Sequence, residues 1–253
     1  MTYVMPQQHW IVFDGRSLND FNTYTSGEGT FSSPEKIYDT IEIPGRNGEL
    51  TVEYGTYRNI EVVYPSFIPY DLRKYSSALR SFLGSRTGYC RLEDTRHPEE
   101  YRMARFVSAI EVNSAGLDVG SFELNFNCKP QRYLKTGEQK VSTNSSSYTI
   151  INPTFMNAKP IIIFHGPGGS SASGTLTING NVIQISQVIE NVAIDLETMF
   201  ASRTTNGITQ NMNQYIKEVT GSMEKMYLVP GSNVITKTGS ITSIDIIPRW
   251  WTL

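Results

Sequence analysis

The residues best suited to chemistry are three histidines: His9, His97 and His165. One of them stands in an acidic segment, EDTRHPEE, which also contains Asp94, Glu99 and Glu100. Carboxylates around an imidazole could hold a metal ion or work as an acid–base pair. The alternative is a solvated loop, which is favoured because Pro98 breaks regular structure and the charges are dense.

Other catalytic motifs are incomplete. HGPGG, from His165 to Gly169, is similar to the oxyanion loop of α/β-hydrolases, but the chain contains no GxSxG elbow. Cys90 and Cys128 form no CxxC pair and are expected to be reduced, small hydrophobic side chains. The two carboxylates of a glycosidase meet only in space, so the sequence leaves that class open. We predict no catalytic residue, no metal, no cofactor and no enzymatic activity.

The composition is that of an ordered globular protein. The 253 residues can form one large domain or two ordinary ones. The 22 Lys and Arg residues nearly balance the 24 Asp and Glu residues, which excludes a strongly basic nucleic-acid binder. No apolar run is long enough for a membrane helix, and MTYVMPQQHW at the start carries no secretory signal. We therefore expect no membrane partner, and folding in a reducing cytoplasm.

The two halves of the chain differ in composition. Residues 1–136 contain 15 basic and 17 acidic residues, whereas residues 137–253 contain 7 of each. The 28 aromatic residues divide 20 to 8 in the same direction. A polar Ser/Thr-rich stretch, residues 136–148, lies at the change and has the composition of a linker or surface loop. This contrast predicts two domains with different surfaces.

Alternating apolar residues predict a β-hairpin in the front half. The first run contains Ile41 and Ile43, and the second contains Leu50, Val52 and Tyr54. They are joined by Pro44-Gly45-Arg46-Asn47-Gly48, whose Gly and Asn residues tolerate the positive φ angles of such loops. Further strands are expected over residues 9–13, 60–64, 89–93, 103–113 and 121–127.

One segment of the front half has helical spacing instead. Its apolar positions are Leu72, Tyr75, Leu79, Phe82 and Leu83. Pro69 precedes them and Gly84 follows them, as expected at the two ends of a helix. The spacing predicts one amphipathic helix that packs on a sheet.

The back half has strand patterns only. Asn179-Gly180 between two alternating runs is a strong hairpin signal, and it places Leu176 opposite Ile183. Residues 161–164, 192–196 and 244–246 predict further strands, and residues 229–234 predict a turn. Several short strands with regular turns favour a β-sandwich.

Four stretches resemble one protein family. IPGRNG (residues 43–48) resembles the hallmark hairpin of phage distal tail proteins. FELNFNCKPQRYL (122–134) resembles the strand that ends the family's first domain, and NPTFMNAKPIIIFHG (152–166) the opening of its second. LVPGSNVI (228–235) and the terminal IDIIPRWWTL resemble its closing hairpin and last strand. In order and length the chain looks like the short form from a long-tailed phage of a Gram-positive host.

The resemblance implies a mainly β fold with two β-sandwich-like domains. Residues 1–136 would form a ring-forming domain with one α-helix and an extended β-hairpin. Residues 137–253 would form a galectin-like sandwich. The expected function is a structural hub of the tail tip, a homo-hexameric ring that joins the tail tube protein to the tip or fibre protein of the host-adsorption apparatus. DNA would pass through its central channel, and the ring would reside at the distal end of the virion tail after assembly in the host cytoplasm.

The hairpin supplies the candidate oligomer interface. A long hairpin can add its strands to the sheet of a neighbour, which gives many directional hydrogen bonds. The candidate interface residues are Ile43, Pro44, Gly45, Arg46, Asn47 and Gly48. The alternative function is a carbohydrate-binding module that recognises host cell-wall sugar through the back domain. The few aromatic residues of that half argue against it.

Overall fold

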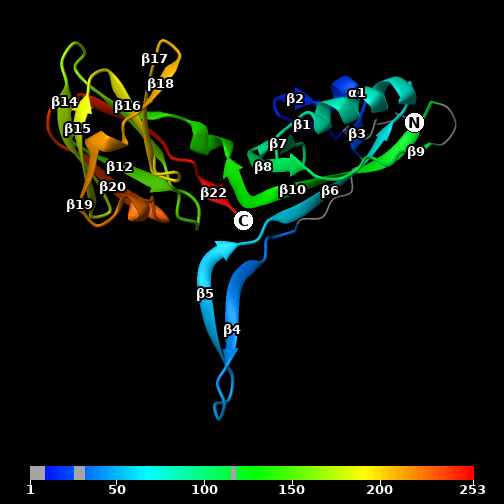
Figure 1. Ribbon diagram of the computed structural model, residues 1–253, viewed down its shortest axis with the longest axis horizontal. Helices are drawn as coiled ribbons and strands as arrows, with labels where there is room; N and C mark the ends of the chain where they lie inside the picture. The colour runs from blue at the N-terminus through cyan, green and yellow to red at the C-terminus, as the bar shows by residue number, and fades with distance from the viewer. Residues whose placement is uncertain (1–8, 26–31, 115–117) are drawn as a thin grey trace, which may run out of the picture. The chain divides into compact units, whose positions relative to one another are not determined.

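Figure 1 shows a computed structural model of the chain, in which residues 9–25, 32–114 and 118–253 are described. Residues 1–8, in which we expected no secretory signal, lie outside the described part. The chain divides into two compact units. Unit 1 comprises Met1–Arg132 with Leu253, and unit 2 comprises Tyr133–Thr252. Separate folding of residues 1–136 and 137–253 stays a prediction.

Unit 1 is built on one β-sheet with the strand order β2-β1-β7-β8-β10-β6-β3. Its strands are β1 (Ile11–Phe13), β2 (Arg16–Ser17), β3 (Tyr24–Thr25), β6 (Ile60–Ile68), β7 (Cys90–Asp94), β8 (Glu100–Phe106) and β10 (Gly120–Leu134), with β9 (Asn113–Ser114) beside β10. His9, just before β1, forms a bridge with Thr25 of β3. This bridge brings the residue before β1 next to β3, so the sheet is strongly curved. The mainly β fold with one helix is confirmed.

Helix α1 (Leu72–Gly84) packs on the core of unit 1. Leu72, Leu79, Phe82 and Leu83 are buried, as their helical spacing predicted. The Phe82 ring stacks on Phe21 of the 3-10 helix η1 (Leu18–Phe21) with 5.0 Å between ring centroids. Each fully buried side chain of this size contributes about 1.5–3 kcal/mol. Burial of this apolar face therefore holds the helix against the core of unit 1.

The strand expected over residues 103–113 is wrong after Phe106, where β8 ends. Residues 107–112 form no regular strand. Ile110 and Val112 are nevertheless partly buried against the core. The apolar residues of this segment are spaced so that they can be buried, and a segment that lies outside the sheet can bury them as well as a strand can.

The predicted hairpin is present as a two-stranded sheet of its own, formed by β4 (Lys36–Glu42) and β5 (Glu49–Tyr57). Figure 1 shows it as the blue and cyan pair. Most of its residues are exposed, so it packs little against the rest of unit 1.

Unit 2 is a sandwich of two sheets. One has the order β11-β21-β13-β16-β17-β18 and the other β12-β20-β14-β15-β19. The strands are β11 (Val141–Thr143), β12 (Ser147–Asn152), β13 (Ile161–His165), β14 (Ala172–Ile178), β15 (Asn181–Val188), β16 (Asn191–Asp195), β17 (Phe200–Thr205), β18 (Ile208–Asn211), β19 (Ile216–Thr220), β20 (Gly231–Lys237) and β21 (Ser243–Ile247). The last strand, β22 (Trp251–Thr252), lies outside both sheets and pairs with β10. Short 3-10 helices lie between some of them: η2 (Lys135–Glu138), η3 (Asn213–Tyr215) and η4 (Met223–Lys225).

The Asn-Gly hairpin of unit 2 has the predicted register. Leu176 pairs with Ile183, and both side chains are buried in the core. Asn179 and Gly180 have φ angles of 47° and 82°, as a two-residue turn between twisted strands requires. The turn predicted over residues 229–234 is shorter than expected, because β20 already begins at Gly231. Leu228 before it forms only an isolated bridge with Ala158.

The polar stretch 136–148 is not a linker. It contributes to η2 and β12 and contains all of β11, in which Val141 pairs with Ile246 of β21. Its Ser and Thr side chains suit an edge strand with one wet face, which composition alone does not distinguish from a loop. Among the described residues, no helix is long and apolar enough to cross a membrane.

Candidate assembly interface

The predicted interface residues occupy the loop between β4 and β5. All six, from Ile43 to Gly48, are exposed. The Arg46 backbone N–H donates to the Ile43 carbonyl at 3.1 Å. Gly45 and Gly48 have φ angles of 80° and 84°, in the left-handed region that favours glycine. The structure therefore brings these residues together at the tip of the hairpin.

The register of the hairpin sorts its side chains onto two faces. Ile41 pairs with Leu50, and Asp39 pairs with Val52. Directly paired residues point to the same side, and side chains alternate along each strand. We call the side formed by Ile41, Leu50, Val52 and Tyr54 the apolar hairpin face. These side chains are 49%, 44%, 38% and 55% exposed.

The opposite face of the hairpin is mostly polar, although Tyr38, which pairs with Glu53, also lies on it. Thr40 pairs with Thr51, and Glu42 lies directly across from Glu49 near the tip. Like charges in this position repel each other. At the base, the Lys36 ammonium lies 2.6 Å from the Glu53 carboxylate. Both side chains of this pair are largely exposed, so it contributes little stability.

An isolated two-stranded hairpin is marginally stable in water. Apolar side chains at this exposure, gathered on one side of such a hairpin, are typical of a surface that another protein covers. On the same side, the Tyr54 hydroxyl donates to the Asp39 carboxylate at 2.5 Å, and this hydrogen bond raises the pKa of Tyr54. Among the described strands, β4 and β5 pair only with each other, so their outer edges remain open to a further strand.

Replacing Gly48 with Val should weaken assembly without unfolding unit 2. A Cβ at Gly48 would meet no atom within 4 Å, so the cost lies in the backbone. A β-branched residue at this φ costs about 1–2 kcal/mol or more. We expect a lower assembled mass by light scattering and unchanged thermal unfolding of unit 2. Thr51→Val is the matched control, because it adds the same side chain to the hairpin in β5, outside the candidate interface loop, at a residue without positive φ. Normal assembly of Gly48→Val would contradict a role for the loop geometry.

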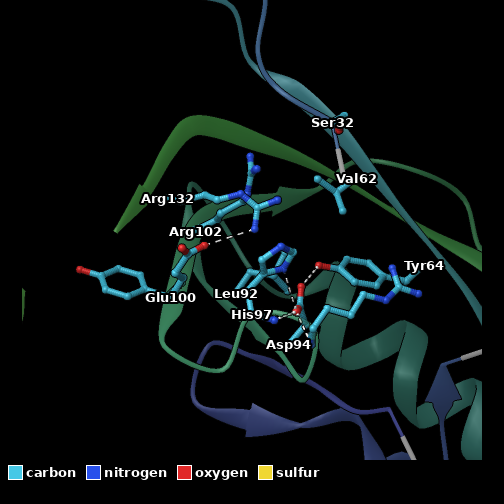
Figure 2. A pocket seen from close by; sticks show the side chains of 11 residues that line it. Ser32, Val62, Tyr64, Leu92, Asp94, His97, Glu100, Arg102 and Arg132 are labelled. Carbon is cyan, nitrogen blue, oxygen red and sulfur yellow. Dashed lines mark hydrogen bonds and ion pairs between the residues drawn. The ribbon is translucent and has the colours of Figure 1, made fainter. Parts of the chain in front are cut away.

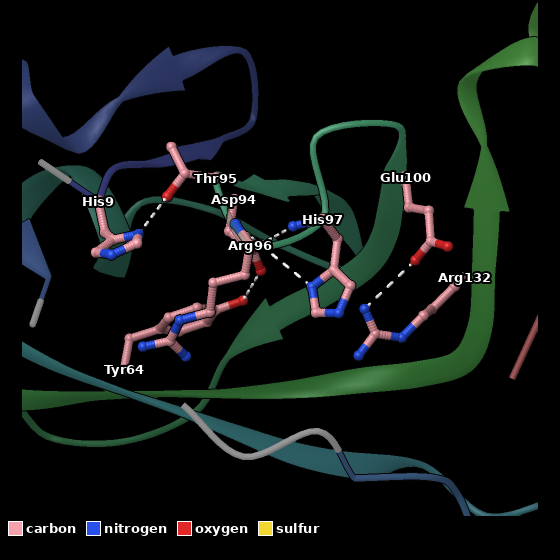
Figure 3. A network of polar contacts seen from close by, with 8 residues as sticks. All are labelled: His9, Tyr64, Asp94, Thr95, Arg96, His97, Glu100 and Arg132. Carbon is pink, nitrogen blue, oxygen red and sulfur yellow. Dashed lines mark hydrogen bonds and ion pairs between the residues drawn. The ribbon is translucent and has the colours of Figure 1, made fainter. Parts of the chain in front are cut away.

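The acidic segment EDTRHPEE, which we expected to be a solvated loop, forms an ordered turn between β7 and β8 that is held by hydrogen bonds. Asp94 accepts a hydrogen bond from the Tyr64 hydroxyl at 2.6 Å and from the backbone N–H groups of Arg96 and His97 at 2.9 Å each (Figure 3). The His97 Nδ1 atom lies 3.3 Å from the same carboxylate. Burial alone would raise the pKa of Asp94, but these hydrogen bonds lower it overall.

The four candidate residues of this segment do not converge on one point. Glu99 is exposed, while Glu100 faces Arg132 of β10, with 3.4 Å between carboxylate and guanidinium. Within the described ranges, no three His, Cys, Asp or Glu side chains are placed to hold a metal ion. The acid–base pair of Asp94 and His97 is therefore arranged as a hydrogen-bonded support for the turn.

The remaining candidates have local structural contacts. The His165 Nε2 atom lies 2.8 Å from Asp245, which also pairs with Lys140 at 3.0 Å. Gly168 and Gly169 both have φ angles of 73° in the loop that follows β13. Cys128 is buried, and burial raises the pKa of its thiol to about 12, so it is protonated at neutral pH.

A second exposed apolar position, Phe155, was missed by the sequence reasoning. Its side chain is 95% exposed, although the turn that carries it is tightly held. Asn152 donates to the carbonyls of Met156 and Leu228 at 2.8 and 3.0 Å, and it accepts from the Thr154 N–H at 2.9 Å. The Asn-Pro-Thr sequence before it marks a turn, but nothing in that pattern indicates which side chain faces solvent.

Comparisons with known proteins extend over both units. No family model matches the sequence, and no curated protein matches it. The Dit protein of phage SPP1, described as a paradigm of the hub adsorption apparatus in phages infecting Gram-positive bacteria, is similar with a TM-score of 0.68 and 14% identity, over 94% of this chain and 97% of that one. Two structures of the activated phage P2 baseplate are also similar. The one with calcium gives a TM-score of 0.55, 10% identity and coverage of 96% and 97%. The one with strontium gives 0.54, 9% identity and coverage of 94% and 96%. The chain therefore has the fold of the SPP1 Dit protein over nearly its whole length.

Proposed function

We propose that this chain is a structural hub of a phage tail tip, which assembles as a hexameric ring between the tail tube and the tip or fibre proteins. The observation that carries the proposal is the apolar hairpin face. It is an exposed hydrophobic surface on a small sheet that packs little against its own unit, in a chain with the fold of a phage hub protein. An exposed apolar surface of this kind is more stable when a second copy of the chain covers it than when it is in contact with water.

A ring follows from the kind of contact that the hairpin would make. A hairpin from one subunit that covers a different surface on the next is a heterologous contact, which closes into a ring when the rotation between subunits is right. The Dit protein of SPP1 supplies the precedent for a hub. In the ring that we propose, unit 1 makes the subunit contacts, and unit 2 is the galectin-like domain.

The partners and location follow the same proposal. One face of the ring would meet the tail tube and the other the tip or fibre, and DNA would cross the central channel only in transit. The formal net charge of −2 suits such a channel, because a basic lining would hold DNA by counterion release. We place the protein in the virion, at the distal end of the tail of a phage with a Gram-positive host. It would be a short-form hub assembled in the host cytoplasm.

Light scattering after size exclusion tests the assembly directly. The full chain should show a mass about six times 28.4 kDa, either alone or after mixing with the tail proteins of its phage. Negative-stain images should show rings with sixfold symmetry. A chain that remains at 28.4 kDa at every concentration and with every tail partner would refute the proposal.

A further inference from the structure

Within the described part of unit 1 lies a buried arginine whose two terminal nitrogens have no hydrogen-bond partner. Arg102 of β8 is paired in register with Leu92 of β7, so its side chain points to the inner side of the sheet, where an apolar residue is usual. Only 6% of the residue is exposed. Both terminal nitrogens, Nη1 and Nη2, are buried and have no hydrogen-bond partner among the residues that the structure describes. A buried charge in this condition is costly unless something pairs with it.

The carboxylates near Arg102 are already engaged. Asp94 receives its hydrogen bonds from the Tyr64 hydroxyl and from the β7–β8 turn. Glu100 receives one from Arg132 at 3.4 Å. Arg132 adds a second positive charge beside Arg102, and Figure 2 shows the two side chains next to each other. Burial, followed by the charge of Arg132, lowers the pKa of Arg102.

A small cavity opens between these side chains. Its volume is about 20 Å³, and Arg102, Arg132, Arg96, His97, Tyr64 and Glu100 are among the residues that line it. Space of this size is slightly more than one water molecule needs, so it holds only the smallest polyatomic groups. A phosphodiester or a sugar ring is too large for it. Among the described residues, three guanidinium groups line the cavity, against two carboxylates that already accept hydrogen bonds, so the cavity favours a negatively charged occupant.

We propose that this cavity is a binding site for a small carboxylate anion, held end-on by Nη1 and Nη2 of Arg102. Two carboxylate oxygens match the fork of a guanidinium group, and each hydrogen bond is strengthened by charge on both partners. Arg132 stabilises the anion from the side while it keeps its contact with Glu100. The site lies wholly in unit 1, and it stands independently of the tail-tip function.

The test uses the full chain and ¹³C-labelled sodium formate in a chloride-free, low-salt buffer. Wild-type protein should broaden the formate ¹³C resonance in a saturable manner, with one formate bound per chain. Arg102→Met should weaken this binding about tenfold or more, equivalent to ~1.4 kcal/mol, because both hydrogen bonds are lost. Arg105→Met is the matched control, because Arg105 is an exposed arginine of the same strand whose side chain points to the other side of the sheet. It should bind formate like the wild type.

Arg102→Lys is a second variant, which tests the site if Arg102→Met does not fold. Lysine keeps the positive charge but presents one nitrogen, so its affinity should fall between those of the wild type and Arg102→Met. Absence of saturable formate binding by the wild type would overturn the proposal, as would equal binding by the wild type and a folded Arg102 variant. If formate does not bind but Arg102 variants lower the assembled mass, the occupant is a carboxylate side chain of a second copy, which also overturns the free-anion site.

Discussion

Replacing Leu50 with Asp on the apolar hairpin face should convert the assembled ring into single chains of 28.4 kDa. Leu50 is 44% exposed in the isolated chain and pairs with Ile41, so it lies within the surface that a neighbour would cover. Losing the burial of one leucine costs about 1.5–3 kcal/mol per contact, and a carboxylate buried without a partner costs more. Since every subunit contact in the ring carries the change, assembly should be lost. Light scattering and negative-stain images measure the result.

Thr51→Asp is the matched control for this variant. Thr51 is the next residue of β5, and it points to the polar face, where it pairs with Thr40. The same charge is thus added one position away but on the other side of the hairpin. Wild-type assembly of Leu50→Asp would contradict the apolar hairpin face as an interface. If both variants lost assembly equally, the cause would be the added charge and not the face of the hairpin that carries it.

Replacing Asn233 with Ala should lower the free energy of unfolding of unit 2 by about 2–4 kcal/mol. Asn233 is fully buried, and its amide oxygen accepts from the Val229 N–H and the Asn179 side chain at 2.8 Å each. Its amide nitrogen donates to the carbonyls of Val229 and Gly231 at 2.8 and 2.9 Å. Alanine would remove all four of these hydrogen bonds and would leave a cavity where the buried amide was, which accounts for the effect.

Urea unfolding followed by tryptophan fluorescence measures this change. A Trp10→Phe background confines the signal to Trp250 and Trp251, which belong to unit 2. Asn157→Ala is the control, because Asn157 is exposed and its side chain makes no hydrogen bond in the described part of the chain. It should change stability by less than about 0.5 kcal/mol. A loss below 1 kcal/mol in Asn233→Ala would show that water replaces the missing amide.

Features that depend on neighbours in the sequence were predicted well. Helix α1 and the register of the Asn179-Gly180 turn follow from apolar spacing and from residues that tolerate positive φ. The hairpin of β4 and β5 also follows from local alternation, although Ile43 belongs to its loop and not to its strand. These signals act over a few residues, where backbone geometry leaves little choice.

Predictions failed where alternation or composition was used without knowledge of which strands pair. Residues 107–112 alternate like a strand but pack without a regular ladder, and the polar stretch 136–148 contains β11 of the sandwich. Whether a segment joins a sheet depends on an edge offered by a distant segment. For β11 that edge is β21, about one hundred residues later.

The sequence by itself determined the fold class, the helix and the exposed hairpin loop, because periodicity and turn residues encode them locally. Only the tertiary structure decided which polar side chains meet. Tyr64 and Asp94 are 30 residues apart, and Glu100 and Arg132 are 32 apart, yet strand pairing brings each pair within hydrogen-bond distance. The position of Arg102 beside a cavity has the same origin. From sequence alone, a basic residue in an alternating strand is predicted to face solvent. Arg102 is buried because it lies on the inner side of a curved sheet.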